Sequence, residues 1–269
     1  MIIDAHVHLM EKKPDREWVH THWPGQTPYG ITAEEYIKKM DECTPRIDKA
    51  IIFGLSSLAS DTPQRMVEEN NYVMDVLERH PTRFIGAGVV DPSWGDHAIE
   101  ELHRFVDKGL RVVKIRFSSM HYHANCKAGQ RVFAEIEKLG ALPICHSDWT
   151  HYSNPLMLGD LARMFPDLKM VIQHFGEYLS LDTLSVCKSL DNVYVDTSAL
   201  VHPKNVIKFM DEVSEDRILL ASDTLSVRGG LQPQDALNRV LCLDLPKNRL
   251  DKLLGENAVK LLKSVGVKA

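Results

Sequence analysis

Short apolar runs alternate with helical patterns along the whole chain, and this alternation restricts the possible folds more than any other feature. We count eight such runs, at residues 2–8, 49–55, 84–90, 111–117, 141–146, 169–174, 192–197 and 217–223. Strands that alternate strictly with helices predict a parallel sheet. Eight units in 269 residues predict an α/β TIM (β/α)8 barrel, because such barrels take roughly 250 residues. We therefore expect a single barrel domain over 1–269.

The segments between these runs carry helix signals. Helices are expected near 32–43, 63–79, 96–107, 128–139, 155–164, 181–190 and 203–213, with terminal helices after 223. Pro63 suits a first helical turn, and Gly109 and Gly140 stand where a C-terminal glycine ends a helix. No GxGxxG or Walker sequence follows any strand. This disfavours an open, nucleotide-binding sheet.

Composition narrows the class of protein. Hydrophobic residues make up 44% of the chain and charged residues 26%, which is ordinary for a globular domain. The net charge is -5 and Lys and Arg are scattered, so we expect no nucleic-acid partner. No apolar run approaches the ~18 residues of a membrane span, and no basic leader precedes the first strand. Five cysteines without a CxxC pair indicate reduced thiols, so we expect a cytoplasmic protein without membrane contact.

Histidines and an aspartate stand at the ends of four predicted strands. His6 and His8 end the first strand, and side-chain alternation puts both on one face with Cα atoms about 6.5–7 Å apart. His146, His174 and Asp223 end the fifth, sixth and eighth strands. In a barrel these strand ends form one rim, where the active site lies. One such histidine alone is more often a hydrogen-bonded polar residue, but the whole set favours a shared metal ion.

The ordered motifs resemble a known family. The segments IDAHVH, ICHS, IQHFG, LLASD and GENAVKLL, in this order, resemble the amidohydrolase superfamily. The closest likeness is to its amidohydrolase-related (amidohydrolase 2) branch, which includes the aminocarboxymuconate semialdehyde decarboxylase type. The resemblance covers essentially the whole chain. The set of motifs is specific to the superfamily and much less specific to any substrate.

This resemblance implies a role for each matching residue. His6, His8 and His146 correspond to metal ligands, and Asp223 to a ligand that also accepts the proton of a metal-bound water. His174 corresponds to the residue that polarises or hydrogen-bonds the reacting group. Three imidazoles and a carboxylate suit Zn²⁺, with Mn²⁺, Fe²⁺ or Ni²⁺ as alternatives that ligand type does not separate. The resemblance also implies that a homodimer or larger homo-oligomer is possible.

Two cations of the fourth strand need separate treatment. In RVVKIRF the alternation puts Lys114 and Arg116 on the inner face of the barrel. Lys114 has three interpretations: a carboxylated bridge between two metals, a contact to an anionic substrate, or a pair with a buried acid such as Asp4. The branch that the chain resembles is mononuclear, so we expect one metal, and a second only if Lys114 is carboxylated. Arg116 suits a substrate carboxylate, with a structural salt bridge as its alternative.

Other polar residues near the rim are secondary candidates. His20, His22, His121 and His123 fall in predicted loops and suit substrate contact better than metal binding. Asp196 and Glu177, near the ends of the seventh and sixth strands, are candidates to orient His174 or the substrate, or are plain turn residues.

Three functions are compatible with these residues. The leading hypothesis is a metal-dependent hydrolase that activates water toward a small, carboxylate-bearing ester, lactone or amide. The alternative is a nonoxidative metal-dependent decarboxylase, a carboxy-lyase for a small aromatic or enol-type carboxylic acid. The third is a non-catalytic metal-binding barrel, which the open position typical of catalytic zinc sites disfavours.

Overall fold

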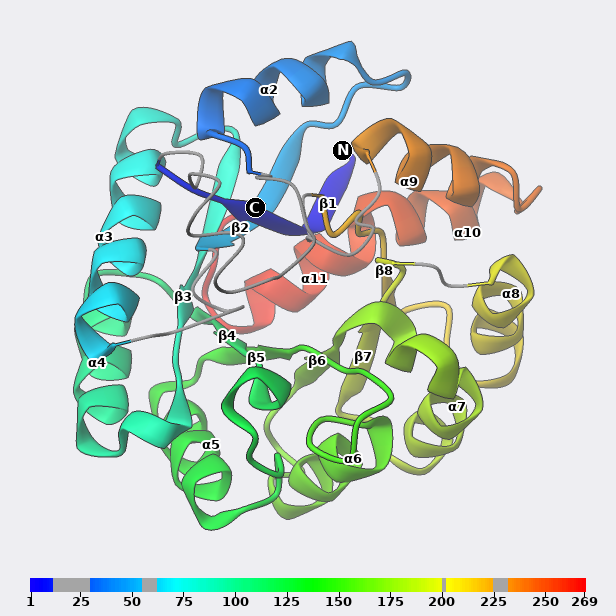
Figure 1. Ribbon diagram of the computed structural model, residues 1–269. Coiled ribbons are helices and arrows are strands. Elements are labelled where there is room, and N and C mark those ends of the chain that lie inside the picture. The colour runs from blue at the N-terminus through cyan, green and yellow to red at the C-terminus, as the bar shows by residue number, and fades with distance from the viewer. Residues whose placement is uncertain (12–29, 55–61, 200–201, 225–231) are drawn as a thin grey trace, which may run out of the picture.

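The chain forms the predicted barrel (Figure 1). The computed structural model describes residues 1–11, 30–54, 62–199, 202–224 and 232–269. Eight parallel strands pair in chain order, each with the next. They are β1 (Ile3–Leu9), β2 (Lys49–Gly54), β3 (Phe84–Val89), β4 (Val112–Ile115), β5 (Leu142–Cys145), β6 (Met170–Ile172), β7 (Val193–Asp196) and β8 (Ile218–Leu219).

The last strand also contacts the first. The backbone N–H of Ala5 donates to the carbonyl of Leu220 at 2.9 Å, and the N–H of Asp223 donates to that of His6 at 3.0 Å. A parallel bridge between Val7 and Thr224 continues this pairing. β8 is therefore shorter than the predicted 217–223, yet the residues after it still follow β1 to the rim.

Helices surround the strands on the outside of the barrel, except the last, which lies across one end (Figure 1). They are α2 (Ala33–Glu42), α3 (Pro63–Arg79), α4 (Asp96–Asp107), α5 (Lys127–Leu139), α6 (Pro155–Met164), α7 (Ser180–Ser189), α8 (Pro203–Glu212), α9 (Pro233–Leu241), α10 (Lys247–Asp251) and α11 (Asn257–Ser264). Their starts follow local chemistry. Thr32 and Glu35 form a capping box before α2, and Pro63 occupies the first turn of α3 as predicted.

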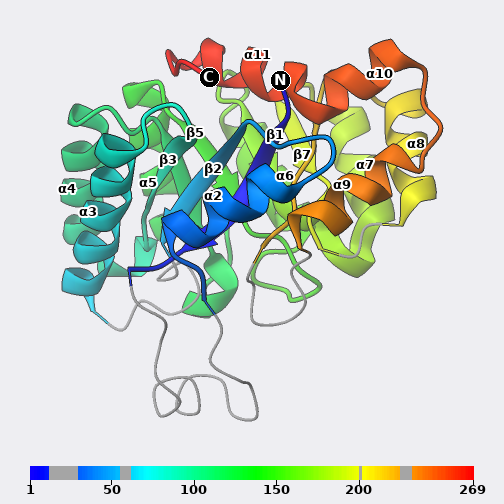
Figure 2. The same ribbon diagram turned by 90° about the horizontal axis from the view of Figure 1, so that it is seen from above.

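One end of the barrel is closed by α11. Figure 2 shows this helix across the end at which both chain termini lie. Ala258, Leu261 and Leu262 pack into the apolar interior formed by residues such as Ile3 and Leu142. In the π-helical segment Lys252–Glu256, a Cβ on Gly255 would meet the carbonyl oxygen of Met1 at 2.2 Å. This backbone approach requires glycine, and it holds the helix against the start of β1.

A bulge in β1 changes which side chains face inward. Asp4 is opposite Ala50 on β2 but Val7 is opposite Ile52, so β1 has one extra residue between them. Ile3 and Ala5 belong to the inner cluster, whereas Val7 and Leu9 pack outward toward the helices. Simple alternation would have put Asp4 on the same face as the histidines. The bulge turns Asp4 outward and still leaves the next two histidines inside.

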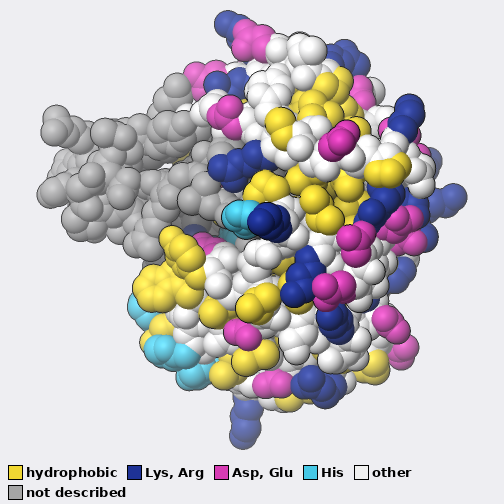
Figure 3. Space-filling view, turned by 90° about the vertical axis from the view of Figure 1, so that its right-hand side faces the viewer, with side chains coloured by type: hydrophobic (Ala, Val, Ile, Leu, Met, Phe, Trp, Pro, Cys, Tyr) yellow, Lys and Arg dark blue, Asp and Glu magenta, His cyan; other side chains and the backbone are white. Residues whose placement is uncertain are grey.

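The surface mixes both signs of charge. On the face shown in Figure 3, Lys and Arg lie among Asp and Glu, with apolar side chains between them. The helices described in the structure include none long and apolar enough to cross a membrane.

Candidate metal centre

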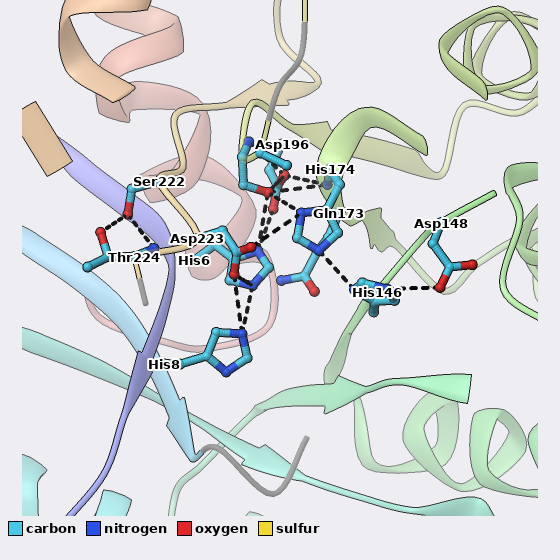
Figure 4. A network of polar contacts seen from close by, with 12 residues as sticks. His6, His8, His146, Asp148, Gln173, His174, Asp196, Ser222, Asp223 and Thr224 are labelled. Atoms are coloured by element: carbon cyan, nitrogen blue, oxygen red, sulfur yellow. Dashed lines mark hydrogen bonds and ion pairs between the residues drawn. The ribbon is translucent and has the colours of Figure 1, made fainter. Parts of the chain in front are cut away.

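Three predicted ligands converge at the end of β1. His6 Nε2 lies 3.3 Å from His8 Nε2 and 3.1 Å from Asp223 Oδ1, and His8 Nε2 lies 3.3 Å from the same oxygen (Figure 4). All three side chains are buried. The β1 bulge and the β8–β1 backbone contacts bring them together from the two ends of the chain.

Local backbone geometry places Asp223. Its φ of 55° lies in the left-handed region, which is uncommon for a residue with a Cβ. Ser222 before it donates its backbone N–H to Asp4 Oδ1 at 2.9 Å, and Tyr36 donates its hydroxyl to Asp4 Oδ2 at 2.6 Å. Asp4 therefore anchors the strand ends from outside the barrel, and it is not the partner of Lys114.

The ligand atoms fit a divalent cation. The Nε2 atoms of His6 and His8 and a carboxylate oxygen of Asp223 lie within 4.8 Å of one another. Asp223 Oδ1 is buried and receives no hydrogen bond of regular geometry, although two imidazole nitrogens face it. Two imidazoles and one carboxylate are ligands that Zn²⁺ and Mn²⁺ accept. A cation between them would satisfy all three groups at once.

A second group supports the first. Asp196, at the end of β7, accepts from His6 Nδ1 at 3.3 Å and from the backbone N–H of His174 at 2.8 Å. Ser198 Oγ lies 2.9 Å from His174 Nδ1 and 3.3 Å from His6 Nδ1. Because the Asp196 carboxylate contacts Nδ1 of His6, Nε2 of the same ring is available to bind a cation. Carboxylates commonly orient metal-binding histidines in this way. Asp196 was a candidate to orient His174 or the substrate. It holds the backbone of His174 and contacts the ring of His6 instead of the ring of His174.

His174 lies in a turn after β6. Four consecutive residues, His174, Phe175, Gly176 and Glu177, have positive φ between 50° and 74°. Such backbone is costly for residues with a Cβ and often occurs at functional sites. A Cβ on Gly176 would meet Thr183 Oγ1 at 2.3 Å, so this tight turn requires glycine. The turn puts His174 Nδ1 4.0 Å from Asp223 Oδ2.

His146 lies beside His174. Its Nδ1 is 2.9 Å from His174 Nε2, and its Nε2 is 3.1 Å from Asp148 Oδ2. Asp148 is held by Thr150 and Ser153. Within the described part of the chain, the group of ligand atoms around His6, His8 and Asp223 does not include His146. His146 would need to turn one ring nitrogen toward that group to act as a ligand.

Burial and charge set the protonation of these groups. Burial lowers the pKa of His8 to about 4 and that of His146 to about 3, and it lowers the pKa of His174 well below its ordinary value. Although burial opposes it, contact with His6 and His8 holds the pKa of Asp223 well below its usual range. The pKa of His6 is raised instead, because although burial and the charge of Lys114 lower it, Asp223 and Asp196 outweigh them. Metals bind neutral imidazoles and an ionised carboxylate, so a cation here would displace the proton of His6.

Lys114, on β4, faces the inside of the barrel. Lys114 is 1% exposed, and its Nζ donates to Gln173 Oε1 and lies 4.6 Å from the centre of the Phe53 ring. Burial, reinforced by the charge of Arg116, lowers the pKa of Lys114 to about 7. Arg116 lies just beyond β4, half-buried, with Nε 3.3 Å from Ser118 Oγ. After burial, the charges of Arg116 and Lys114 contribute to lowering the pKa of His146, so both cations lie near this buried histidine.

The loop histidines lie away from the ligand atoms. His121 and His123 are exposed. His121 contacts the Tyr152 ring edge-to-face and His123 contacts it at a tilt, and His123 Nδ1 contacts the carbonyl of His151. His20 and His22 lie outside the described residues.

Sequence reasoning missed three polar residues at the centre: Asp148, Gln173 and Ser198. Each stands one or two positions from a strand-end residue that was singled out, and this proximity is their only signal. Ser, Gln and Asp are common in turns after strands, so their type alone did not separate them from ordinary loop residues.

Comparisons with known proteins identify the family and the fold of this chain. A sequence model of the amidohydrolase family (Amidohydro_2) matches residues 3–263. The 2-amino-3-carboxymuconate-6-semialdehyde decarboxylase of Dictyostelium discoideum is 22% identical over 256 residues, covering 79% of this chain and 70% of that protein.

Two solved structures share the fold. The 5-carboxyvanillate decarboxylase of Novosphingobium aromaticivorans, with bound manganese and 3-methoxy-4-hydroxy-5-nitrobenzoic acid, has a TM-score of 0.77 at 16% identity, covering 98% of this chain and 97% of that one. The dihydroxybenzoic acid decarboxylase of Polaromonas, with bound manganese and 2-nitroresorcinol, has a TM-score of 0.72 at 16% identity, covering 97% and 96%.

Proposed function

This chain belongs to the amidohydrolase family (Amidohydro_2) and is an enzyme, and on that basis we propose that it is a metal-dependent, nonoxidative decarboxylase of a small aromatic or enol-type carboxylic acid. This was the alternative to hydrolysis in the sequence analysis. The relatives named above favour it, because all three are decarboxylases.

One observation carries the proposal: a cluster of cation ligands and two cationic side chains share the inside of one barrel. His6, His8 and Asp223 suit a divalent metal, and Lys114 and Arg116 add positive charge beside it. Desolvated positive charge favours an anionic substrate. A substrate carboxylate can form a bidentate hydrogen bond with the guanidinium group of Arg116, and it can also bind the metal.

The proposed metal is a single divalent ion held by His6, His8, Asp223 and, after reorientation of its ring, His146. Bound manganese in two relatives of the same fold supports Mn²⁺ beside the Zn²⁺ that the ligands suggested. When bound, the ion supplies a Lewis acid that polarises oxygens of the substrate. A second metal would require carboxylation of Lys114.

Side chains of the protein would then bind the negatively charged substrate and transfer the proton. Arg116 and Lys114 hold the substrate anion in place. The bond between the carboxyl group and its carbon breaks, its electron pair stays on that carbon, and carbon dioxide leaves. The proton that replaces the carboxyl group comes from water, and Asp223 and His174, whose Oδ2 and Nδ1 lie 4.0 Å apart, relay it to that carbon.

The test is a product assay on protein loaded with Mn²⁺ or Zn²⁺. Candidate acids, such as 2,6-dihydroxybenzoate and 5-carboxyvanillate, carry a ¹³C-labelled carboxyl group, and labelled carbon dioxide is measured in parallel with turnover of an ester, lactone and amide panel. We expect label release from at least one acid, lost on chelation. Hydrolysis of a panel member without label release from any acid would favour the hydrolase instead.

A further inference from the structure

Lys114 is a buried lysine that has no carboxylate partner in the described part of the chain. Its side chain is 1% exposed, and no ion pair joins its Nζ to an acid among residues 1–11, 30–54, 62–199, 202–224 and 232–269. Its contacts there are the amide oxygen of Gln173 and the face of Phe53. A buried ammonium ordinarily needs an anion, because an amide dipole and a ring replace only part of its hydration.

Gln173, which accepts from Lys114, has a side-chain N–H donor without an acceptor among the described residues. A lysine can only donate hydrogen bonds, so Oε1 of the amide group accepts from Lys114 and Nε2 takes no part in this contact. Gln173 Nε2 is buried and has no acceptor among the described residues. Figure 4 shows the Gln173 side chain between the imidazoles of His6 and His146 in that view. A buried donor without an acceptor costs stability and calls for a partner.

Lys114 and Gln173 both have a donor that could bind the same anion. Lys114 Nζ and Gln173 Nε2 are donors on adjacent side chains, and one anion with two oxygens satisfies both. Arg116, just beyond the end of β4, adds positive charge, and a divalent ion at His6, His8 and Asp223 would add more. The surplus positive charge and the missing acceptor thus point to the same ligand chemistry.

We propose that Lys114 and Gln173 form a subsite inside the barrel that receives the carboxylate of the substrate beside the metal. The inference rests on the proposed function for the identity of the substrate. The subsite itself requires only a carboxylate. Lys114 Nζ contributes the charge, and Gln173 Nε2 contributes a second donor that fixes the plane of the carboxylate.

Binding of benzoate and of uncharged benzamide to the Mn²⁺-loaded protein tests the subsite, by calorimetry. We expect benzoate to bind at least about tenfold more tightly than benzamide, because a hydrogen bond to a charged group contributes more than a neutral one. Lys114→Met should weaken benzoate binding by about 10- to 100-fold and leave benzamide binding within about twofold. Gln173→Glu should weaken benzoate binding as strongly, because the new carboxylate occupies Lys114.

The matched control is a second Lys–Gln pair. Lys39 Nζ donates to Gln232 Oε1 at 2.8 Å between α2 and the start of α9, so Lys39→Met removes the same kind of contact elsewhere. It should leave benzoate binding unchanged. Metal content and thermal midpoint are measured for each variant, and Gln173→Glu keeps the test decisive if Lys114→Met does not fold.

Three results would overturn the subsite. They are benzoate binding unaffected by both variants, no benzoate binding to the native protein, and a ¹³C carbamate signal on Lys114 after incubation with ¹³C-bicarbonate. The last would mean that the lysine carries a carboxyl group covalently. The subsite and the proposed function can fail separately. If benzoate binds through Lys114 but no acid is decarboxylated, the subsite proposal stands and the proposed function fails. If Lys114→Met decarboxylates its substrate with native KM, the proposed function stands and the subsite proposal fails.

Discussion

The two ends of the barrel are built from opposite kinds of side chain. At one end, Leu261 and Leu262 of α11 pack into an apolar interior. At the other, His6, His8 and Asp223 bury polar atoms against one another. The first end removes apolar surface from water, and the second takes charged groups out of water at a cost. We infer that α11 supplies stability and that the polar end gives up part of it for chemistry, as is usual for this fold.

The largest expected effect is at the polar end. Asp223→Asn keeps the shape of the side chain but removes the charge that faces His6 and His8. We expect turnover of the substrate found by the labelled-acid assay to fall about 10³-fold, within the range for loss of a proton-transfer group. Bound metal, measured by mass spectrometry of the dialysed protein, should fall as well.

Asp191→Asn is the control for that variant, because Asp191 is exposed at the opposite end of β7 and should leave activity and metal content unchanged. If Asp223→Asn turned over substrate at the native rate, Asp223 and the polar end of the barrel would not take part in the reaction.

The closed end should show the reverse pattern. Leu261→Ala removes a buried side chain of α11 and should lower the free energy of unfolding by about 2–5 kcal/mol in urea titrations. Metal content and turnover of the folded protein should stay native. Leu181→Ala, at a 67% exposed position of α7, is the matched control and should change stability little. Loss of metal in Leu261→Ala would show that the two ends are coupled.

Lys114, between the two ends, should make stability depend on pH. Its pKa is about 7 in the folded protein and 10.5 as the ordinary value, so the unfolded chain holds more protons between these limits. The cost of burying the charge is present in full below pH 7 and declines as pH rises. We expect the free energy of unfolding of the metal-free protein to increase by about 2 kcal/mol between pH 7 and 8.5, relative to Lys114→Met.

Urea titrations of both proteins measure that difference. The window stops at pH 8.5 because buried thiols contribute in the opposite direction at higher pH: burial raises the pKa of Cys145 to about 12 from 9.0. Parallel curves for the two proteins would show that Lys114 does not titrate here.

The smallest expected effect is at the hydrogen bonds of Asp4, which holds the strand ends beside the polar end of the barrel. Tyr36→Phe removes the 2.6 Å hydrogen bond to Asp4, which also accepts from the backbone of Ser222. We expect a loss of about 1–2 kcal/mol in the free energy of unfolding, with metal content unchanged, because two backbone N–H groups still reach Asp4. A large loss of metal instead would mean that Asp4 fixes Asp223 directly.

Much of the fold was readable from the sequence because periodic signals are local. All eight strands and the helices from α2 to α8 occur near their predicted residues. The boundaries were less certain where polar turns continue a strand's direction: residues 220–223 follow β1 but are not part of β8. The bulge in β1 was not predictable, because it depends on pairing with β2.

The candidate site was readable in part. His6, His8 and Asp223 converge as expected, whereas His146 lies with His174 and Asp148. That pairing depends on the left-handed backbone at residues 174–177, a conformation that the residue types of the motif IQHFG do not by themselves specify.

By itself, the sequence determined the barrel and which strand ends carry histidine and aspartate, because strand and helix periodicity and residue type are properties of neighbouring positions. Only the tertiary structure decided that Asp4 faces outward, that Asp196 and Ser198 support His6, and that Lys114 meets Gln173 rather than an acid. These contacts join residues 32 to 192 positions apart, and their geometry is set by a bulge and a turn that form only when the strands pair.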